Sequence, residues 1–197
     1  DEIKAALGMP DGFGHMKENK ERNIAATYDY TDRDGNLLYQ VVRYSPKAFS
    51  QRRPDGKGGW IWNLEDVEPV VFNWPAVSDA IERGDSVFCV EGEKDVLTLQ
   101  SLGLVGTCNS GGAGKWRDSL SNALRGADVV ILPDNDDTGR KHGDTVAMFL
   151  QGHASRVRIL NLPDLPEKGD LTNWIAAGGT VASLLELVQS VSEWKPQ

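Results

Sequence analysis

The second part of the chain alternates between continuous apolar runs and amphipathic stretches. Stretches with apolar residues at helical spacing, such as EKDVLTLQSL and GRKHGDTVAMFLQG, separate the runs. Strands without polar alternation that are separated by helices are typical of a parallel sheet covered on both faces. We therefore predict an α/β fold with a doubly wound parallel sheet of about four strands. The predicted strands are SVFCV, LVGTCN, ADVVIL and SRVRILNL.

The first part of the chain has a different pattern. Residues 25–44 indicate a β-hairpin, in which AATYDYT and LLYQVVRY are the strands and Gly35 lies in the turn. A loop rich in Gly and Pro follows, and then a short helix at WPAVSDAIERG. We therefore predict three parts: a leader or linker at 1–24, a small basic α+β subdomain at 25–85, and the doubly wound domain at 86–197.

Composition excludes several classes of protein. Hydrophobic residues make up 40% of the chain and charged residues 25%, which is ordinary globular usage and not that of a disordered chain. Because no apolar run approaches the ~20 residues that span a bilayer and no signal peptide is visible, we expect no membrane partner. Cys89 and Cys108 lie in apolar stretches without CxxC spacing, which favours buried free thiols and a cytoplasmic location.

The net charge of -8 bears on nucleic-acid binding. A strongly acidic chain binds DNA poorly without specific contacts, because the phosphates repel it. Any contact with nucleic acid must therefore rest on local basic clusters or on bound metal. The Gly- and Pro-rich loop holds such a cluster and ends in two aromatic residues, Trp60 and Trp62.

Acidic residues follow three of the predicted strands. Glu91 follows SVFCV, Asp134 and Asp136 follow ADVVIL, and Asp170 comes after SRVRILNL and before a helix. Because ligands of open α/β sheets bind outside the carboxyl ends of the strands, we expect these side chains at one edge. Hard oxygen ligands suit Mg²⁺ or Mn²⁺, which would also relieve their mutual repulsion. Taken singly, each acid could instead cap a helix, and the two-Asp pattern also fits an aspartyl-phosphate phosphatase.

In combination, the motifs VEGEKD and PDNDDTG resemble the Toprim domain shared by bacterial-type primases, topoisomerases and some nucleases. The pattern of that family is a strand ending in Glu-Gly, then a strand ending in Asp-x-Asp with a nearby Gly. Here Glu91 opens the first motif, and Asp134, Asp136 and Gly139 form the second. VEGEKDV and DNDDTGR look most like the primase version, and Asp170 resembles the later acidic position of primases.

The resemblance implies a DNA primase catalytic core that makes short RNA primers on single-stranded DNA from ribonucleoside triphosphates, with Mg²⁺ or Mn²⁺. It implies catalytic and metal-binding roles for Glu91, Asp134 and Asp136. It implies an outer metal-ligand role for Asp170.

Residues 25–85 resemble the subdomain that precedes Toprim in phage- and plasmid-type primases, which are often fused to a replicative helicase. In primases this subdomain helps to hold template and nucleotides. The residues that would hold phosphates are Arg52, Arg53 and Lys57 of this subdomain, together with Lys115 of the sheet domain. Trp60 and Trp62 fit two alternatives, stacking on a template base or packing between the hairpin and the sheet domain.

Two other functions fit the same motifs. A Toprim nuclease would cleave DNA or RNA phosphodiesters with the same metals and water, but the basic subdomain before the sheet disfavours it. A non-catalytic Toprim module would bind nucleic acid or a partner, but the intact acidic set disfavours it.

Overall fold

The structure is a computed structural model that describes residues 23–196. The leader predicted at 1–24 therefore lies outside the described residues, apart from its last two, which begin the first strand. The strands are β1 (Asn23–Thr31), β2 (Leu37–Ser45), β3 (Ala48–Pro54), β4 (Trp60–Ile61), β5 (Ser86–Cys89), β6 (Val105–Thr107), β7 (Asp128–Ile131) and β8 (Arg156–Ile159). The helices are α2 (Trp74–Arg83), α3 (Glu93–Ser101), α4 (Asp118–Asn122), α5 (Asp137–Leu150), α6 (Leu171–Ala176) and α7 (Val181–Ser190).

The first sheet is antiparallel, in the order β1-β2-β3-β4. The predicted hairpin is confirmed: Tyr30 pairs with Tyr39 across β1 and β2, and Gly35 takes the positive φ of 88° that the turn requires. The helix predicted before residue 85 is α2, and it ends at Gly84 with a φ of 76°. The boundary at residue 85 stays a prediction.

The prediction of one long loop after the hairpin is wrong in part. Residues 48–54 form β3, which pairs with β2 from Gln40↔Arg52 to Tyr44↔Ala48, and β4 pairs with the end of β3. Pro46 precedes the segment and Pro54 ends it, and both suggest a loop, because proline cannot donate to a ladder. Pairing with β2 outweighs this weak local preference.

The second sheet is parallel, in the order β6-β5-β7-β8, and it confirms the predicted four-stranded core. The chain leaves β5 towards β6 on one side, whereas β7 lies on the other side of β5. The point where the strand order reverses therefore lies between β5 and β7, which is where ligands bind in open α/β sheets.

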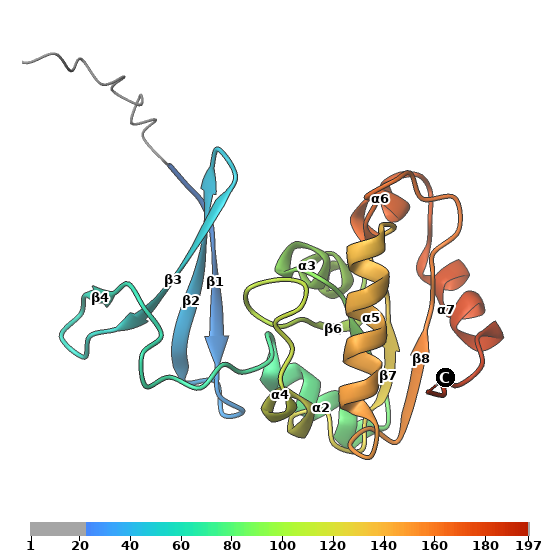
Figure 1. The fold of residues 1–197 in the computed structure, drawn as a ribbon, viewed down its shortest axis with the longest axis horizontal. Helices are drawn as coiled ribbons and strands as arrows, with labels where there is room; N and C mark the ends of the chain where they lie inside the picture. The colour runs from blue at the N-terminus through green and yellow to red at the C-terminus, as the bar shows by residue number, and fades with distance from the viewer. Residues whose placement is uncertain (1–22, 197) are drawn as a thin grey trace, which may run out of the picture.

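Helices cover the parallel sheet on both faces, and the first sheet lies beside it (Figure 1). Along β5 and β7, Val87 and Val129 pack on one face, with residues of α2, α4 and α5. Phe88 and Val130 pack on the other face, with residues of the antiparallel sheet, α3, α6 and α7. Burial on both faces explains why these strands are continuously apolar in sequence. Within the described residues, no helix combines the length and the apolar character needed to cross a membrane.

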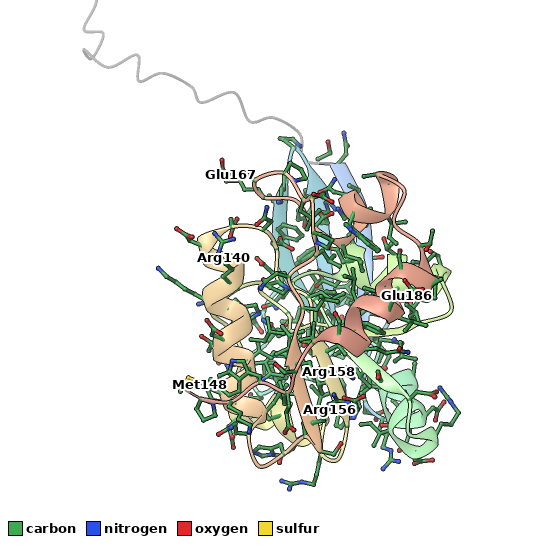
Figure 2. All side chains as sticks on the ribbon, turned by 90° about the vertical axis from the view of Figure 1, so that its right-hand side faces the viewer. Arg140, Met148, Arg156, Arg158, Glu167 and Glu186 are labelled. Atoms are coloured by element: carbon green, nitrogen blue, oxygen red, sulfur yellow. The ribbon has the colours of Figure 1, made fainter. Side chains whose placement is uncertain are left out.

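A buried ion pair ties α7 to the sheet. Arg158 on β8 is only 4% exposed, and its guanidinium lies 2.6 Å from Asp128 Oδ2 on β7. The same guanidinium donates to the carbonyl of Val188 on α7 at 3.0 Å. Figure 2 shows Arg158 on β8 beside this helix. A buried charge requires such partners, so this contact sets where α7 lies on β8.

Two tyrosines join the two sheets. The Tyr30 hydroxyl donates to Glu93 Oε1 on α3 at 2.8 Å, and Glu93 is buried. The Tyr30 ring stacks on Tyr39, with 4.6 Å between the ring centroids. The Tyr39 hydroxyl donates to Ser110 Oγ, after β6, at 3.1 Å. These buried hydrogen bonds hold the antiparallel sheet against the carboxyl-terminal edge of the parallel sheet.

The helix α3 offers a matched test of the packing. Leu99 is fully buried, whereas Leu97 on the same helix is 47% exposed. We expect Leu99→Ala to lower the free energy of unfolding by about 2–5 kcal/mol, because it leaves a cavity in the core. Leu97→Ala should change it by less than about 0.5 kcal/mol. Urea unfolding followed by circular dichroism measures both, and equal losses would contradict this packing.

Candidate active site

Glu91 and Asp134 leave neighbouring strands at the same edge of the parallel sheet. In the pairing of β5 with β7, Cys89 lies opposite Ile131, and the amide of Leu132 donates to the carbonyl of Cys89 at 2.9 Å. Glu91 comes two residues after Cys89, and Asp134 comes three after Ile131. Both are half-buried. The structure thus brings them together beside the point where the strand order reverses.

The turn after β7 places Asp136 and Asp137 differently. Asp136 caps α5, and its Oδ1 accepts a hydrogen bond from the amide of Gly139 at 2.8 Å. A Cβ at Gly139 would lie 2.5 Å from the carbonyl oxygen of Asp134, so only glycine lets α5 start this close. Asp137 faces away, with its side chain 87% exposed and paired with Arg140.

Asn135, which the sequence analysis did not single out, brings the loop before α6 to this edge. Its amide and carbonyl pair with the backbone of Gly169 and Lys168 at 2.9 and 3.0 Å. Its side chain donates to the carbonyl of Leu165 at 2.8 Å. The only available signal was its place between two aspartates, where alternation turns it away from them.

Asp170 lies at the start of α6, which is fastened to α3. Its Oδ1 accepts from the amide of Asn173 at 2.8 Å, and its Oδ2 lies 2.5 Å from the ammonium of Lys94. Buried Asp95 accepts from the amide of Thr172 at 3.0 Å and also from its hydroxyl. The helix-cap alternative for Asp170 is therefore observed, and the same residue lines the cavity described next.

A cavity of about 640 Å³ opens between this edge and the antiparallel sheet. Its carboxylate wall contains Glu91, Glu93, Asp95, Asp134 and Asp170. Arg43 and Lys47 from the antiparallel side face them, and neither was among the predicted site residues. Strand alternation could have found Arg43, because it shares a face of β2 with the buried Val41.

Burial, with repulsion between carboxylates, raises the pKa of three acids in this cavity, Glu91, Asp95 and Asp134. Burial raises the pKa of Asp134 to about 7, and the nearby carboxylates, Glu91 first, add to the effect. Burial also raises the pKa of Glu91, with Asp136 contributing and Lys47 opposing. All three acids therefore hold protons more tightly than an exposed carboxyl group does.

The donor set suits a hard divalent cation, although no group of three or more His, Cys, Asp or Glu within residues 23–196 is arranged to hold one. The oxygen ligands match the preference of Mg²⁺ or Mn²⁺. The pKa of Asp134 is raised first by burial and then by the nearby carboxylates, and a bound cation would offset both effects. Asp136 and Asp170 would have to share or exchange their present hydrogen bonds.

The predicted phosphate-binding residues do not line this cavity. Arg52 lies over the rings of Trp60 and Trp62, 4.1 and 5.1 Å from their centroids, and donates to Gln40 at 2.8 Å. Neither tryptophan belongs to the hydrophobic cores of the described residues, so packing between the hairpin and the sheet domain is not observed. Trp62 is 52% exposed.

The other predicted basic residues lie at the surface. Arg53 donates to Asn63 at a long 3.4 Å, and exposed Lys57 sits in the turn between β3 and β4. Exposed Lys115 folds its side chain beside Gly111, which lines the cavity, and so lies near the rim.

A second cavity, of about 590 Å³, lies between α7 and the loop before α6. Its lining includes Trp174, Leu187 and Glu186, the last of which is labelled on α7 in Figure 2. We place the site in the first cavity, because only there do strand-end carboxylates face basic side chains.

Comparisons with known proteins show what this fold is similar to. No model of a protein family matches the chain, and no curated protein matches it. The Aquifex aeolicus primase, in a structure of its zinc-binding and RNA polymerase domains, superimposes with a TM-score of 0.65 and 24% identity, over 85% of this chain and 40% of that one. The primase fragment of the bacteriophage T7 primase-helicase gives 0.53 and 23%, over 82% and 61%.

A DnaG primase catalytic domain bound to single-stranded DNA gives a TM-score of 0.61 and 17% identity, over 88% of this chain and 52% of that one. The chain thus spans about half the length of the structures that it matches. Such identities establish the fold. The chain has the fold of primase catalytic cores, which confirms the Toprim-like class and the resemblance at that level.

The raised pKa of Asp134 predicts a gain in stability on neutralising it. Its folded pKa of about 7 exceeds the ordinary aspartate value of 3.8, so its contribution to stability is full below about pH 4 and is lost as the pH rises through 7. Asp134→Asn should therefore stabilise the metal-free protein at pH 8 and not at pH 4. Because solvent screens this half-buried group in part, we expect the free energy of unfolding to rise by only about 1 kcal/mol, or roughly 2–4 °C in Tm.

Thermal melts in EDTA at the two pH values measure this effect. Asp137→Asn is the matched control: Arg140 holds the pKa of Asp137 below its usual range, so that variant should gain nothing at pH 8. Equal Tm values for Asp134→Asn and the parent at pH 8 would contradict the account of the repulsion.

Proposed function

We propose that this chain is the catalytic core of a DNA primase, a nucleotidyltransferase that makes short RNA primers on single-stranded DNA. The observation that carries the proposal is the cavity in which Glu91, Asp134 and Asp170 face Arg43 and Lys47. An anionic nucleotide needs the cations, and a divalent metal needs the carboxylates. The likeness to primase catalytic cores supports the same reaction class.

In the proposed reaction, the 3′-hydroxyl of one ribonucleotide attacks the α-phosphate of the next, and pyrophosphate leaves. Two divalent cations, Mg²⁺ or Mn²⁺, would activate the attacking oxygen and neutralise charge on the leaving group. Asp134 and Asp136 would be the main ligands of these cations, with Asp170 as an outer ligand. The raised pKa of Glu91 suits a group that accepts the proton of the hydroxyl.

The substrate and partners follow from the charges and from the similar structures. Arg43 and Lys47 are placed to contact the triphosphate of the incoming ribonucleotide. One similar structure is a primase catalytic domain bound to single-stranded DNA, and another comes from a primase-helicase. We propose single-stranded DNA as template and a replicative helicase, fused or separate, as partner.

Replacing the aspartates after β7 tests the reaction. We expect Asp134→Asn with Asp136→Asn to reduce extension of an RNA primer annealed to a DNA template by at least about 100-fold, because charge stabilisation in the transition state is lost. The same variant should lose the gain in Tm that Mn²⁺ gives the parent. Gel analysis of labelled primers and thermal melts measure the two effects.

The neighbouring exposed acid supplies the control for this test. Asp137→Asn removes one carboxylate from the same turn and should extend primers like the parent. Cleavage of the labelled strand without extension would favour the nuclease alternative. Neither reaction, with intact binding of DNA, would favour the non-catalytic module.

The basic residues of β3 test the template path. Arg52→Ala with Arg53→Ala should weaken binding to single-stranded DNA and flatten its salt dependence, since each contacted phosphate adds ~0.7 to the log–log slope. Loss of the cation beside Trp60 and Trp62 would also disturb a stacking face worth ~1–3 kcal/mol per base. Fluorescence anisotropy over a salt series measures affinity and slope.

Arg125→Ala is the control for this experiment, because it removes an exposed arginine that lies between α4 and β7 and not in the antiparallel sheet. Its affinity and slope should equal those of the parent. If the double variant also behaves like the parent, β3 does not contact the DNA template. Lys115 and Arg140 then become the candidate template-binding residues.

A further inference from the structure

Lys94 is a cation within the carboxylate wall of the cavity. It lies in the first turn of α3, between the buried acids Glu93 and Asp95, and lines the cavity together with Asp170. Its ammonium is 2.5 Å from Asp170 Oδ2, with side-chain exposures of 43% for Lys94 and 18% for Asp170. The motif VEGEKD therefore contributes a positive charge as well as its acids.

The ion pair occupies the oxygen of Asp170 that is free of the helix cap. Oδ1 accepts the amide of Asn173, and Oδ2 accepts the ammonium of Lys94. A divalent cation that binds Oδ2 would therefore compete with Lys94 for this oxygen. Since the pair is partly exposed, its strength is modest, and a divalent cation can compete for the oxygen.

The displaced ammonium would remain in the cavity, because the helix that carries it is held in place. Glu93 is bonded to Tyr30, and Asp95 is bonded to Thr172. Only the flexible stem of Lys94 has to turn. Arg43 and Lys47 line the same cavity, so an anion inside it would contact cations from both walls.

We propose that Lys94 is the counter-ion that a divalent cation displaces from Asp170, and that its released ammonium binds the phosphates of a metal-bound nucleoside triphosphate. The choice of ligand rests on the proposed function. The exchange gives one residue opposite effects on two ligands: Lys94 opposes the bare metal and favours the metal-bound triphosphate.

Binding measurements on the whole chain test this without any assay of activity. Lys94→Met removes the charge and keeps the length of the side chain. We expect Mn²⁺ alone to bind this variant about three- to ten-fold more tightly than the parent, by electron paramagnetic resonance titration. In saturating Mn²⁺, the unreactive analogue α,β-methylene-ATP should bind about ten-fold more weakly, by calorimetry. Lys94→Arg, which keeps a cation, should stay close to the parent in both titrations.

Two further variants separate exchange at Asp170 from general charge repulsion. Lys141→Met removes an exposed lysine that forms no salt bridge within residues 23–196, and it should change neither affinity. In an Asp170→Asn background, Lys94→Met should no longer improve Mn²⁺ binding, because the contested oxygen has lost its charge. An improvement of the same size in that background would overturn the exchange.

The outcomes also distinguish this inference from the proposed function. If the parent binds Mn²⁺ and Lys94→Met binds it equally well, the inference alone fails. It fails likewise if Lys94→Met shifts the affinities for Mn²⁺ and for the nucleotide analogue in the same direction. If the parent binds no Mn²⁺ at all, the metal site of the proposed function fails, and the inference fails with it.

Discussion

The parallel pairing of β5 with β7 is the constraint on which the rest of the site depends. Because Cys89 lies opposite Ile131, the two strands end at the same level and release Glu91 and Asp134 side by side. The connections from these strands then turn to opposite faces of the sheet, which leaves a crevice between them. Gly139 lets α5 begin directly against the backbone of Asp134. A shift in this pairing would separate the two acids without changing the sequence of either motif.

The antiparallel sheet completes the cavity with the opposite charge. The bond from Tyr30 to Glu93 fixes the sheet against α3, so that Arg43 and Lys47 face the carboxylates. This separation of charge suits a substrate that brings metal to one wall and phosphate to the other. Without a cation, burial and then the neighbouring carboxylates of this wall raise the pKa of Asp134. Binding of metal at the carboxylate wall would therefore stabilise the folded protein.

Much of the fold could be predicted from the sequence, because buried parallel strands leave continuous apolar runs and the acids follow those runs directly. The strand β3 was missed, since Pro46 precedes it, Pro54 ends it and its pairing is tertiary. The contact of Lys94 with Asp170 joins residues 76 positions apart, so no local pattern reports it. The place of Arg52, over two tryptophans and outside the cavity, likewise depends on how β3 and β4 fold.

Anomalous scattering from crystals soaked in Mn²⁺ tests most directly whether this strand edge is a metal centre. We predict one or two anomalous peaks at this strand edge, within about 2.5 Å of carboxylate oxygens of Asp134 and Asp136, with Glu91 or Asp170 beside them. Lys94 should then have left Asp170. Strong peaks only at other carboxylates of the molecule, with this strand edge empty at full Mn²⁺ occupancy elsewhere, would contradict this prediction.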